Sequence, residues 1–425
     1  MAVLSRPLPL EIWMKIVELH KSDKHTLRAL SRCCRSLAPL CQRILFNDLR
    51  IPRLYPSWPS DRAYALARLE DAFTQSPHLA AFVRSVFYVI EDEDGENTSV
   101  HWILGQLKHL TDAEVHYVPK ELNTRLDWGA LDMRLCSSIM HVIQSPNLRC
   151  LTLTRIKNMP SSLFRILASS LAILTLDDVE VEEESSSSCL PDSEVASGPV
   201  QSRIPQIKHL YFYDRDTAER GSRGVLCSRP FIFDFKELGF LHISWGNERE
   251  SALAKELMKT ASKLKGASFQ VDSPLKTTAG VAQAILDYCL DDLTVLTFGL
   301  SHRMPTSQRP VDNDPFLGLA EEFQLLSGRN KVKFLSIHFH IPSGHLNGLT
   351  FCLSRLDDAI ADAFPHLEHF DLQIWVYFLR MRGRKLAFDL EALADEWTDR
   401  NRLQFQKSCR IPGLRFDCRV HILDA

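Results

Sequence analysis

Leu148-Arg-Cys-Leu-Thr-Leu153 is the stretch of sequence that best predicts the fold, because its arrangement of apolar residues recurs along the chain. The arrangement is apolar-x-x-apolar-x-apolar, and the alternation at its end is typical of a strand with one buried face. Six further segments share it: Leu171–Leu176, Ile207–Phe212, Leu238–Ile243, Leu293–Phe298, Val332–Ile337 and Leu367–Leu372.

Segments with helical patterns separate these strands. We expect helices over 128–142, 162–167, 248–264, 279–290, 315–326, 354–363 and 390–397. Alternation of strand and helix requires crossover connections and therefore parallel strands. Two α/β architectures meet this requirement, a repeat solenoid and a doubly wound sheet, and the repeated strand pattern favours the solenoid.

The first 50 residues have a different pattern, with two short amphipathic helices. In the first, Pro9 suits the opening helical position and Glu11 suits the first turn, while Ile12, Ile16 and Leu19 follow at helical spacing. In the second, which Pro39 should end, the apolar residues are Leu27, Leu30, Cys34 and Leu37. Two short helices cannot cover this much apolar surface, so we expect a docking module; the alternative is a helical hairpin packed on its own domain.

These residues resemble the F-box. The matching positions, in order, are Leu8-Pro9, Glu11-Ile12, Ile16, Leu27 with Leu30, Cys34-Arg35 and Leu45-Phe46, and Leu37 stands where the family often has Trp. The resemblance implies that the chain docks onto a Skp-family adaptor and, through it, a cullin. The implied adaptor-binding residues are Leu8, Pro9, Ile12, Ile16, Leu30, Cys34 and Leu37.

The strand pattern resembles a divergent leucine-rich repeat, like that found behind the F-box in many fungal proteins. The spacing is irregular, and the Asn or Cys expected after each strand is mostly missing. The resemblance implies an α/β fold in which a helical F-box at 1–50 and a linker with a first helix at 51–78 precede an irregular solenoid, or horseshoe, at 79–425.

Composition excludes several functional classes. The formal net charge of -3 and the pI near 6.6 do not favour nucleic acid as a partner. The 11 cysteines are odd in number and form no Cys-x-x-Cys pair, which fits a reducing compartment. No leader and no long apolar run are present, so we expect no membrane association and a cytoplasmic or nuclear protein.

No catalytic or cofactor motif supports an enzyme. The chain lacks a phosphate-binding loop, a dinucleotide fingerprint, a nucleophile elbow and a His-Glu-x-x-His helix, so we expect no catalytic residue and no cofactor. The pairs His338 with His340 and His366 with His369 could be interpreted as metal ligands, but a solvent-facing position on repeat strands is the better interpretation. We therefore expect no metal site.

Three segments interrupt the repeats, and a basic cluster lies outside these segments. Residues 182–203 combine a Glu triplet with a Ser run, which predicts a mobile insertion, with phosphorylation of the serines as the alternative. Residues 91–94, followed by Gly95, and residues 302–314 are expected to be surface loops. The basic cluster at 380–385 is interpreted as a solvated turn, with a nuclear import signal as the alternative.

Strand alternation also predicts the target-binding surface. If Leu210 and Phe212 face inward, Tyr211 and Tyr213 face outward. The same reasoning makes the predicted substrate-binding set Tyr211, Tyr213, His242, His338, His340 and Trp375, although Trp375 could instead pack beneath the C-terminal helix.

The function implied by the resemblance is the non-catalytic substrate receptor of a Skp/cullin/F-box ubiquitin ligase, which binds an unknown target protein through the repeats. The alternatives are a non-degradative scaffold of the leucine-rich-repeat type and an enzyme with a doubly wound sheet. The last of these would require the motifs that are missing.

Overall fold

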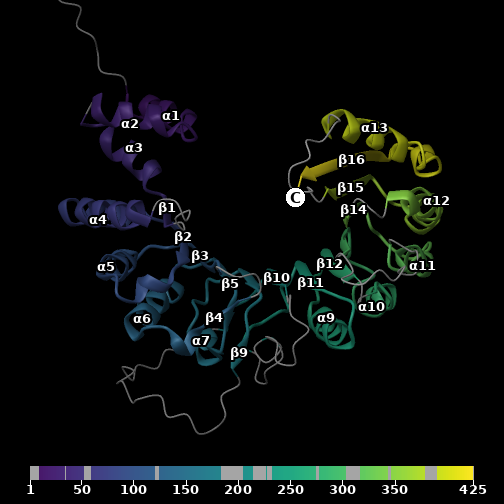
Figure 1. Ribbon diagram of the computed structural model, residues 1–425, viewed down its shortest axis with the longest axis horizontal. Coiled ribbons are helices and arrows are strands. Elements are labelled where there is room, and N and C mark those ends of the chain that lie inside the picture. The colour runs from purple at the N-terminus through teal and green to yellow at the C-terminus, as the bar shows by residue number, and fades with distance from the viewer. Residues whose placement is uncertain are drawn as a thin grey trace, which may run out of the picture. The chain divides into compact units, whose positions relative to one another are not determined.

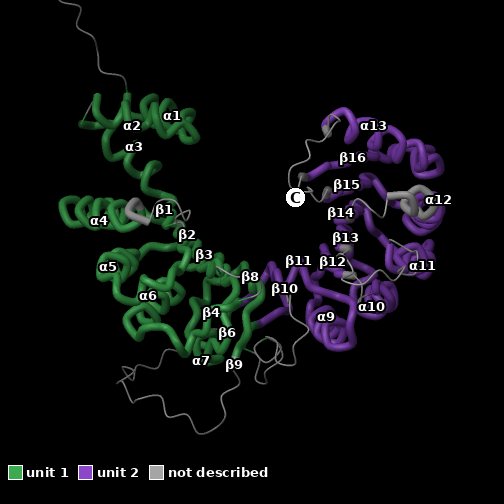
Figure 2. Tube along the Cα trace, in the orientation of Figure 1, with its two compact units in different colours: residues 1–205, 215–233 green, residues 206–214, 234–425 purple. Residues whose placement is uncertain are grey.

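The computed structural model describes residues 9–33, 35–51, 59–119, 124–182, 204–213, 226, 232–273, 277–302, 316–342, 346–378 and 390–424. The protein is a mixed α/β protein with extensive parallel sheet (Figure 1). The chain divides into two compact units, residues 1–205 with 215–233 and residues 206–214 with 234–425 (Figure 2). This division falls inside the segment predicted as one repeat domain.

Unit 1 begins with three short helices, α1 (Leu10–Leu19), α2 (Lys24–Cys33) and α3 (Ala38–Leu45). Pro9 precedes α1 without losing a needed N–H group, and Asp23 accepts hydrogen bonds from the backbone N–H groups of His25 and Thr26 at the start of α2. Hydrogen bonding to Thr26 lowers the pKa of Asp23. Pro39 lies in the first turn of α3, so it starts a helix there.

The remainder of unit 1 alternates strands and helices. The elements are β1 (Asp48–Ile51), α4 (Pro59–Gln75), η1 (Pro77–Phe82), β2 (Ser85–Ile90), η2 (Asp92–Gly95), α5 (Thr98–Gln106), β3 (Asp112–Tyr117), β4 (Leu126–Asp127), η3 (Trp128–Ala130), α6 (Met133–Ile143), β5 (Cys150–Thr154), β6 (Ile156–Lys157), β7 (Met159–Pro160), α7 (Ser162–Arg165), β8 (Ile173–Asp177) and β9 (Val181–Glu182). The strands β1, β2, β3, β5 and β8 pair in that order and are all parallel. Two-residue strands form small additional pairs, β4 with β6 and β7 with β9.

Unit 2 is built in the same way. Its elements are β10 (His209–Tyr213), β11 (Phe240–Ser244), α9 (Glu248–Thr260), β12 (Gly266–Ser273), α10 (Val281–Tyr288), β13 (Val295–His302), α11 (Leu319–Leu325), β14 (Phe334–Pro342), α12 (Leu346–Ala363), β15 (His369–Phe378), α13 (Leu390–Arg402), η5 (Ser408–Arg410) and β16 (Arg415–Asp424). Strands β10 to β16 pair in chain order and are all parallel.

Each sheet is covered by helices on one face. In β5, Leu151 and Leu153 are buried while Thr152 and Thr154 are only half-buried, and the same alternation holds in β8 and β10. Figure 1 shows α4, α5 and α6 on one side of the strands of unit 1, and α9 to α13 on one side of the strands of unit 2. A doubly wound sheet reverses its strand order and carries helices on both faces, so it describes neither unit.

The first apolar residue of the predicted pattern lies three residues before the first buried residue of the strand, and it is itself buried. Leu148, Ile207 and Val332 have no exposed surface, and Leu367 is 4% exposed. The pattern therefore marks a core residue just before each strand as well as two in it. This repeated core lies between strands and helices in both units.

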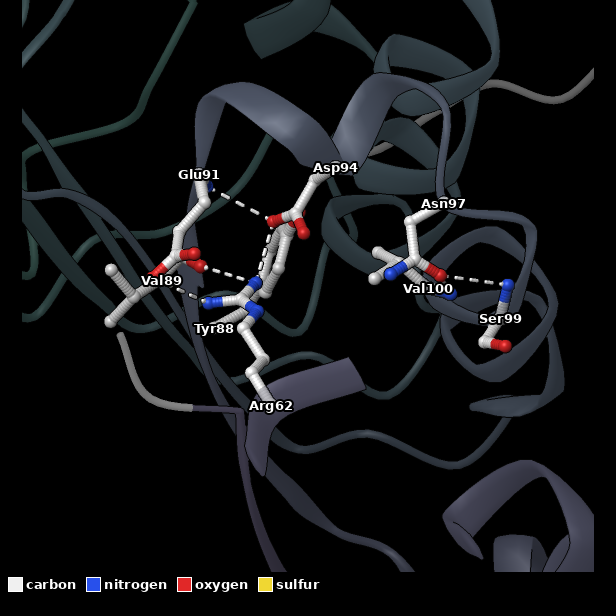
Figure 3. Close-up of polar contacts among 8 residues, drawn as sticks. All are labelled: Arg62, Tyr88, Val89, Glu91, Asp94, Asn97, Ser99 and Val100. Atoms are coloured by element: carbon white, nitrogen blue, oxygen red, sulfur yellow. Dashed lines mark hydrogen bonds and ion pairs between the residues drawn. The ribbon is translucent and has the colours of Figure 1, made fainter. Parts of the chain in front are cut away.

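In the acidic segment 91–94, Asp92 and Glu93 are exposed as predicted for a surface loop, but the prediction was wrong for Asp94. Asp94 is 2% exposed, and its carboxylate lies 2.6 Å from Arg62 Nη2 of α4 and 2.7 Å from the Tyr88 hydroxyl (Figure 3). The Glu91 backbone N–H donates to the same oxygen at 3.0 Å. An acidic run is usually solvated, but here one carboxylate is buried because an arginine from another element pairs with it.

Several predicted features lie outside the described residues. They are Leu8, Cys34, the insertion after Glu182, most of 302–314 and the basic cluster 380–385.

Candidate interaction surfaces

The three helices α1 to α3, which we call the N-terminal hairpin, have a small core of their own. Val17 of α1, Leu27 of α2, Leu37 and Cys41 are buried together. Trp13 and Leu30 are half-buried against this cluster. Polar and aromatic contacts connect the hairpin to the rest of unit 1, since Gln42 lies 3.3 Å from His78 Nε2 and the rings of Phe46 and Phe73 are 6.4 Å apart.

The opposite side of α1 is apolar and uncovered. Ile12, Ile16 and Leu19 follow one another at steps of four and three, so they share one face of the helix. Ile12 is 42% exposed, Leu19 is 81% exposed and Ile16 is half-buried. Pro9 is exposed beside them. We refer to Pro9, Ile12, Ile16 and Leu19 as the α1 stripe.

The prediction that Leu37 belongs to an exposed docking face was wrong, because Leu37 is 2% exposed in the hairpin core. The second helix ends at Cys33, so Leu37 does not continue its apolar stripe and instead precedes α3. Leu30 is half-buried against the same core. Leu19, which had the correct spacing but was not included in the docking set, is the most exposed apolar residue of α1.

The helix-free face of the unit 2 sheet, which we call the open face, carries the residues predicted to bind a target. Tyr211, Tyr213 and His242 are half-buried on β10 and β11, as strand alternation predicts. The His242 ring lies 4.3 Å from the Tyr213 ring and 6.1 Å from the Tyr211 ring. Burial lowers the pKa of His242 to about 4, so its imidazole is neutral at pH 7.

A second aromatic group lies on β14, β15 and β16. Trp375 is stacked between two histidines, with ring centroids 5.9 Å from His340 and 4.0 Å from His421. The Tyr377 hydroxyl lies 2.8 Å from His340 Nδ1. Trp375 is therefore half-buried on the open face, and the alternative position beneath α13 is wrong.

His338 lies beside this group but has polar partners. Its Nε2 atom is 2.8 Å from the Ser336 hydroxyl oxygen, and that hydroxyl donates its hydrogen to Asp371 at 3.2 Å, so its oxygen accepts from the His338 ring. Burial lowers the pKa of His338, and the Asp371 charge partly opposes this shift. His369 stacks on Phe334 at 4.7 Å, whereas His366 is exposed in the preceding turn. Among the described residues, no three His, Cys, Asp or Glu side chains are arranged to hold a metal ion.

Several open-face residues escaped prediction, among them Gln373, Tyr377, Arg419 and His421. Tyr377 could have been found by extending the alternation along β15 beyond Trp375. Arg419 and His421 lie on β16, where Gly413 occupies the position that holds the first apolar residue in the other strands. The apolar pattern therefore does not mark β16, and it gives no sign of these two residues.

No protein-family model matches this sequence, and no curated protein is significantly similar to it. Within the described parts of the chain, none of the helices has the length and apolar character needed to cross a bilayer.

Proposed function

We propose that the protein is a substrate receptor of a Skp/cullin/F-box ubiquitin ligase, acting in the cytoplasm or nucleus. The hairpin α1 to α3 is the F-box, and the strand–helix repeats of the two units form a divergent leucine-rich-repeat solenoid. The α1 stripe binds the adaptor, and the open face of unit 2 binds the target protein. The chain has no catalytic step of its own.

The observation that carries this proposal is the α1 stripe. Val17, Leu27, Leu37 and Cys41 already form a closed core for the hairpin, so Ile12 and Leu19 are not needed to stabilise it. A row of exposed aliphatic residues on one helix costs solubility and is a common feature of protein interfaces. The order of apolar residues here also resembles that of an F-box.

The open face supports the second half of the proposal. Its aromatic residues are half-buried in two groups, at β10–β11 and at β14–β16. Tyrosine and tryptophan are enriched at interface hot spots because they bury a large area with few rotatable bonds. A receptor that holds a target near the conjugating enzyme raises its effective concentration and makes attack by the target lysine effectively intramolecular.

The test is capture of a Skp-family adaptor by the full chain and by the double variant Ile12→Ala, Leu19→Ala. Truncation of two interface residues at about 1 to 2 kcal/mol each predicts a loss of affinity of roughly a hundredfold, measured by isothermal titration calorimetry. The matched control is Met133→Ala with Leu403→Ala, because these apolar side chains are also 83% and 70% exposed but lie elsewhere.

The control variant should bind the adaptor like the unchanged protein. Equal adaptor affinity for the α1 variant and the control would contradict the docking surface. Co-purification of a cullin with the adaptor complex distinguishes the ligase subunit from a scaffold that does not direct degradation.

A further inference from the structure

Two adjacent rows of residues cross strands β14, β15 and β16 on the open face. The parallel register aligns His338 with Gln373 and Gln373 with Arg419 in one row. It aligns His340 with Trp375 and Trp375 with His421 in the next. We call these six residues the donor patch: His338, His340, Gln373, Trp375, Arg419 and His421.

The donor patch contains no carboxylate. Its donors without a partner among the described residues include the Arg419 guanidinium and the Trp375 indole N–H. In contrast, His338 Nε2 already contacts Ser336, and His340 Nδ1 already contacts Tyr377. The rings of His340, Trp375 and His421 are stacked face to face, so their polar edges are what a partner can reach. Within the described part of the chain, Trp375 Nε1 makes no hydrogen bond. An indole N–H can only donate, so this edge suits an acceptor on a partner.

Arg419 is the one fixed charge of the patch. It is exposed, and it forms no ion pair or hydrogen bond with the described residues. Arg415, two residues earlier on the same strand, differs because its Nε atom lies 2.9 Å from Asp417. Arg419 is therefore available to an anionic group from outside.

The carboxylates that border the patch already have partners. Asp371 accepts hydrogen bonds from Ser336 at 3.2 Å and from Gln373 at 2.9 Å. Asp417 is bonded to Arg415 and lies 3.6 Å from His369 Nε2. Asp272 accepts from Gln270 Nε2 at 3.2 Å. Among the described residues, the carboxylates that border the patch are thus engaged elsewhere, which leaves Arg419 open to a carboxylate of another molecule.

We infer that the donor patch binds an acidic segment of the target protein, whose glutamate or aspartate carboxylates accept hydrogen bonds from Arg419 and from the indole N–H of Trp375 beside it. This inference rests on the proposed role of the open face in target binding. It adds to that role the kind of target segment that the open face recognises, which is an acidic one. Charge-assisted hydrogen bonds from arginine to carboxylate provide geometric specificity as well as affinity.

A nucleic acid fits the donor patch less well than an acidic peptide. Binding to a phosphate backbone depends on several cations that neutralise successive phosphates, whereas this patch has one. The formal net charge of the whole chain is -3, which adds no general attraction for a polyanion. Recognition of a few carboxylates by directed donors is the better match.

Binding should strengthen as the pH falls. Burial lowers the pKa of His338, His340 and His421, so these rings are neutral near pH 7 in the free protein. The neighbouring groups shift these pKa values in both directions. Arg419 lowers the pKa of His421, and His338 lowers the pKa of His340. Asp371 raises the pKa of His338 and of His421, and Asp272 raises the pKa of His340. A bound carboxylate raises all three, so the complex takes up protons and gains affinity on acidification.

The experiment measures fluorescence anisotropy of a short labelled peptide of alternating glutamate and serine, titrated with the full chain. The comparison peptide has glutamine in place of each glutamate, which keeps its shape and removes its charge. We expect the glutamate peptide to bind with a Kd below about 1 mM and about tenfold more tightly than the glutamine peptide. The preference should increase between about pH 7.5 and about pH 6.

Arg419→Gln should remove most of this preference, and Arg415→Gln should leave it, because Arg415 is already paired with Asp417. The inference is overturned if both peptides bind equally, if the glutamate peptide does not bind, if the two variants behave alike, or if a labelled oligouridylate binds more tightly at the same site. Adaptor capture is measured on the same preparations. Failure of the unchanged protein to capture the adaptor refutes the ligase proposal alone, and failure of the peptide comparison refutes this inference alone.

Discussion

At the scale of single residues, the ion pair between Arg62 and Asp94 carries a large desolvation cost, because both charged groups are withdrawn from water. Arg62 is 7% exposed, and its Nη2 atom also donates to the backbone carbonyl of Val89 at 3.0 Å. Burial, and next the charge of Asp94, raise the pKa of Tyr88 far above its usual range. Tyr88 therefore stays protonated and donates to Asp94, which joins α4, β2 and η2 through one carboxylate.

Replacement of Asp94 by Ala should destabilise unit 1 by about 3 kcal/mol, because the buried guanidinium loses its buried partner, although it keeps the more exposed Glu91 carboxylate, 3.3 Å from Nη1. Urea unfolding of the full chain measures the change. The control is Glu18→Ala, which breaks an exposed ion pair with Lys21 in the same unit and should cost less than about 1 kcal/mol. Similar urea midpoints for the two variants would contradict a structural role for the buried pair.

Prediction from sequence failed at Asp94 and at Leu37 for two different physical reasons. Arg62 lies 32 positions before Asp94, and no local pattern connects a residue of one helix with an acidic turn so far along the chain. For Leu37, the outcome depended on whether α2 continued past Cys33, and the apolar spacing is equally compatible with both possibilities. Ile12 and Ile16 could be placed correctly because one uninterrupted helix fixes their common face.

At the scale of secondary-structure elements, neighbouring helices of unit 2 are connected through their ends. Glu322 of α11 is buried, and its carboxylate accepts from the backbone N–H groups of Gly280 at 2.9 Å and Ala282 at 2.7 Å. These two N–H groups lie at the start of α10 and have no partner within that helix. A side chain from the next helix along the chain thus supplies the N-terminal cap of α10.

Replacement of Glu322 by Ala should lower the free energy of unfolding by roughly 1 to 3 kcal/mol, since one buried and one half-buried N–H group lose a charged acceptor. Amide hydrogen exchange at Gly280 and Ala282 should accelerate in the same variant. Glu321→Ala is the adjacent control, because Glu321 pairs with Arg355 on the exposed side of α11. If both variants exchange at the same rate at Gly280 and Ala282, the capping contact does not stabilise α10.

Several strands were missed because alanine or glycine replaces one large apolar residue of the pattern. Leu110-Thr-Asp-Ala-Glu-Val115 in β3 and Leu264-Lys-Gly-Ala-Ser-Phe269 in β12 keep the spacing, and Ala113 and Ala267 are as buried as the leucines elsewhere. Alanine favours helices and is depleted in strands, so it contributes no strand signal by itself. A search that accepted alanine at the middle position would have found both strands, but not β16.

At the scale of the whole molecule, the repeated pattern predicted the parallel, chain-ordered sheets but not the division into two units. Each repeat has the same core positions, so nothing in the pattern indicates where one compact unit ends. The consequence for function is that the α1 stripe belongs to unit 1 and the open-face aromatic groups belong to unit 2. Because the two surfaces have no residue in common, a mutation in one of them should leave binding at the other unchanged.

This separation gives the last prediction. The variant Tyr211→Ala, Tyr213→Ala, Trp375→Ala should lose the proteins that proximity labelling detects around the unchanged chain, because it removes the largest half-buried rings of both open-face groups. Its adaptor affinity should be unchanged. The Ile12→Ala, Leu19→Ala variant should show the reverse, with normal target labelling and lost adaptor capture.

The matched control replaces three other aromatic residues, Tyr64, Phe87 and Tyr288, which lie on different elements and are exposed or half-buried. It should retain both the target labelling and the adaptor. If the open-face variant unfolds at a much lower urea concentration than this control, the three rings serve mainly to pack the sheet. If it folds and labels the same proteins as the unchanged chain, the target is recognised outside the open face, and the two surfaces are not the two halves of a receptor.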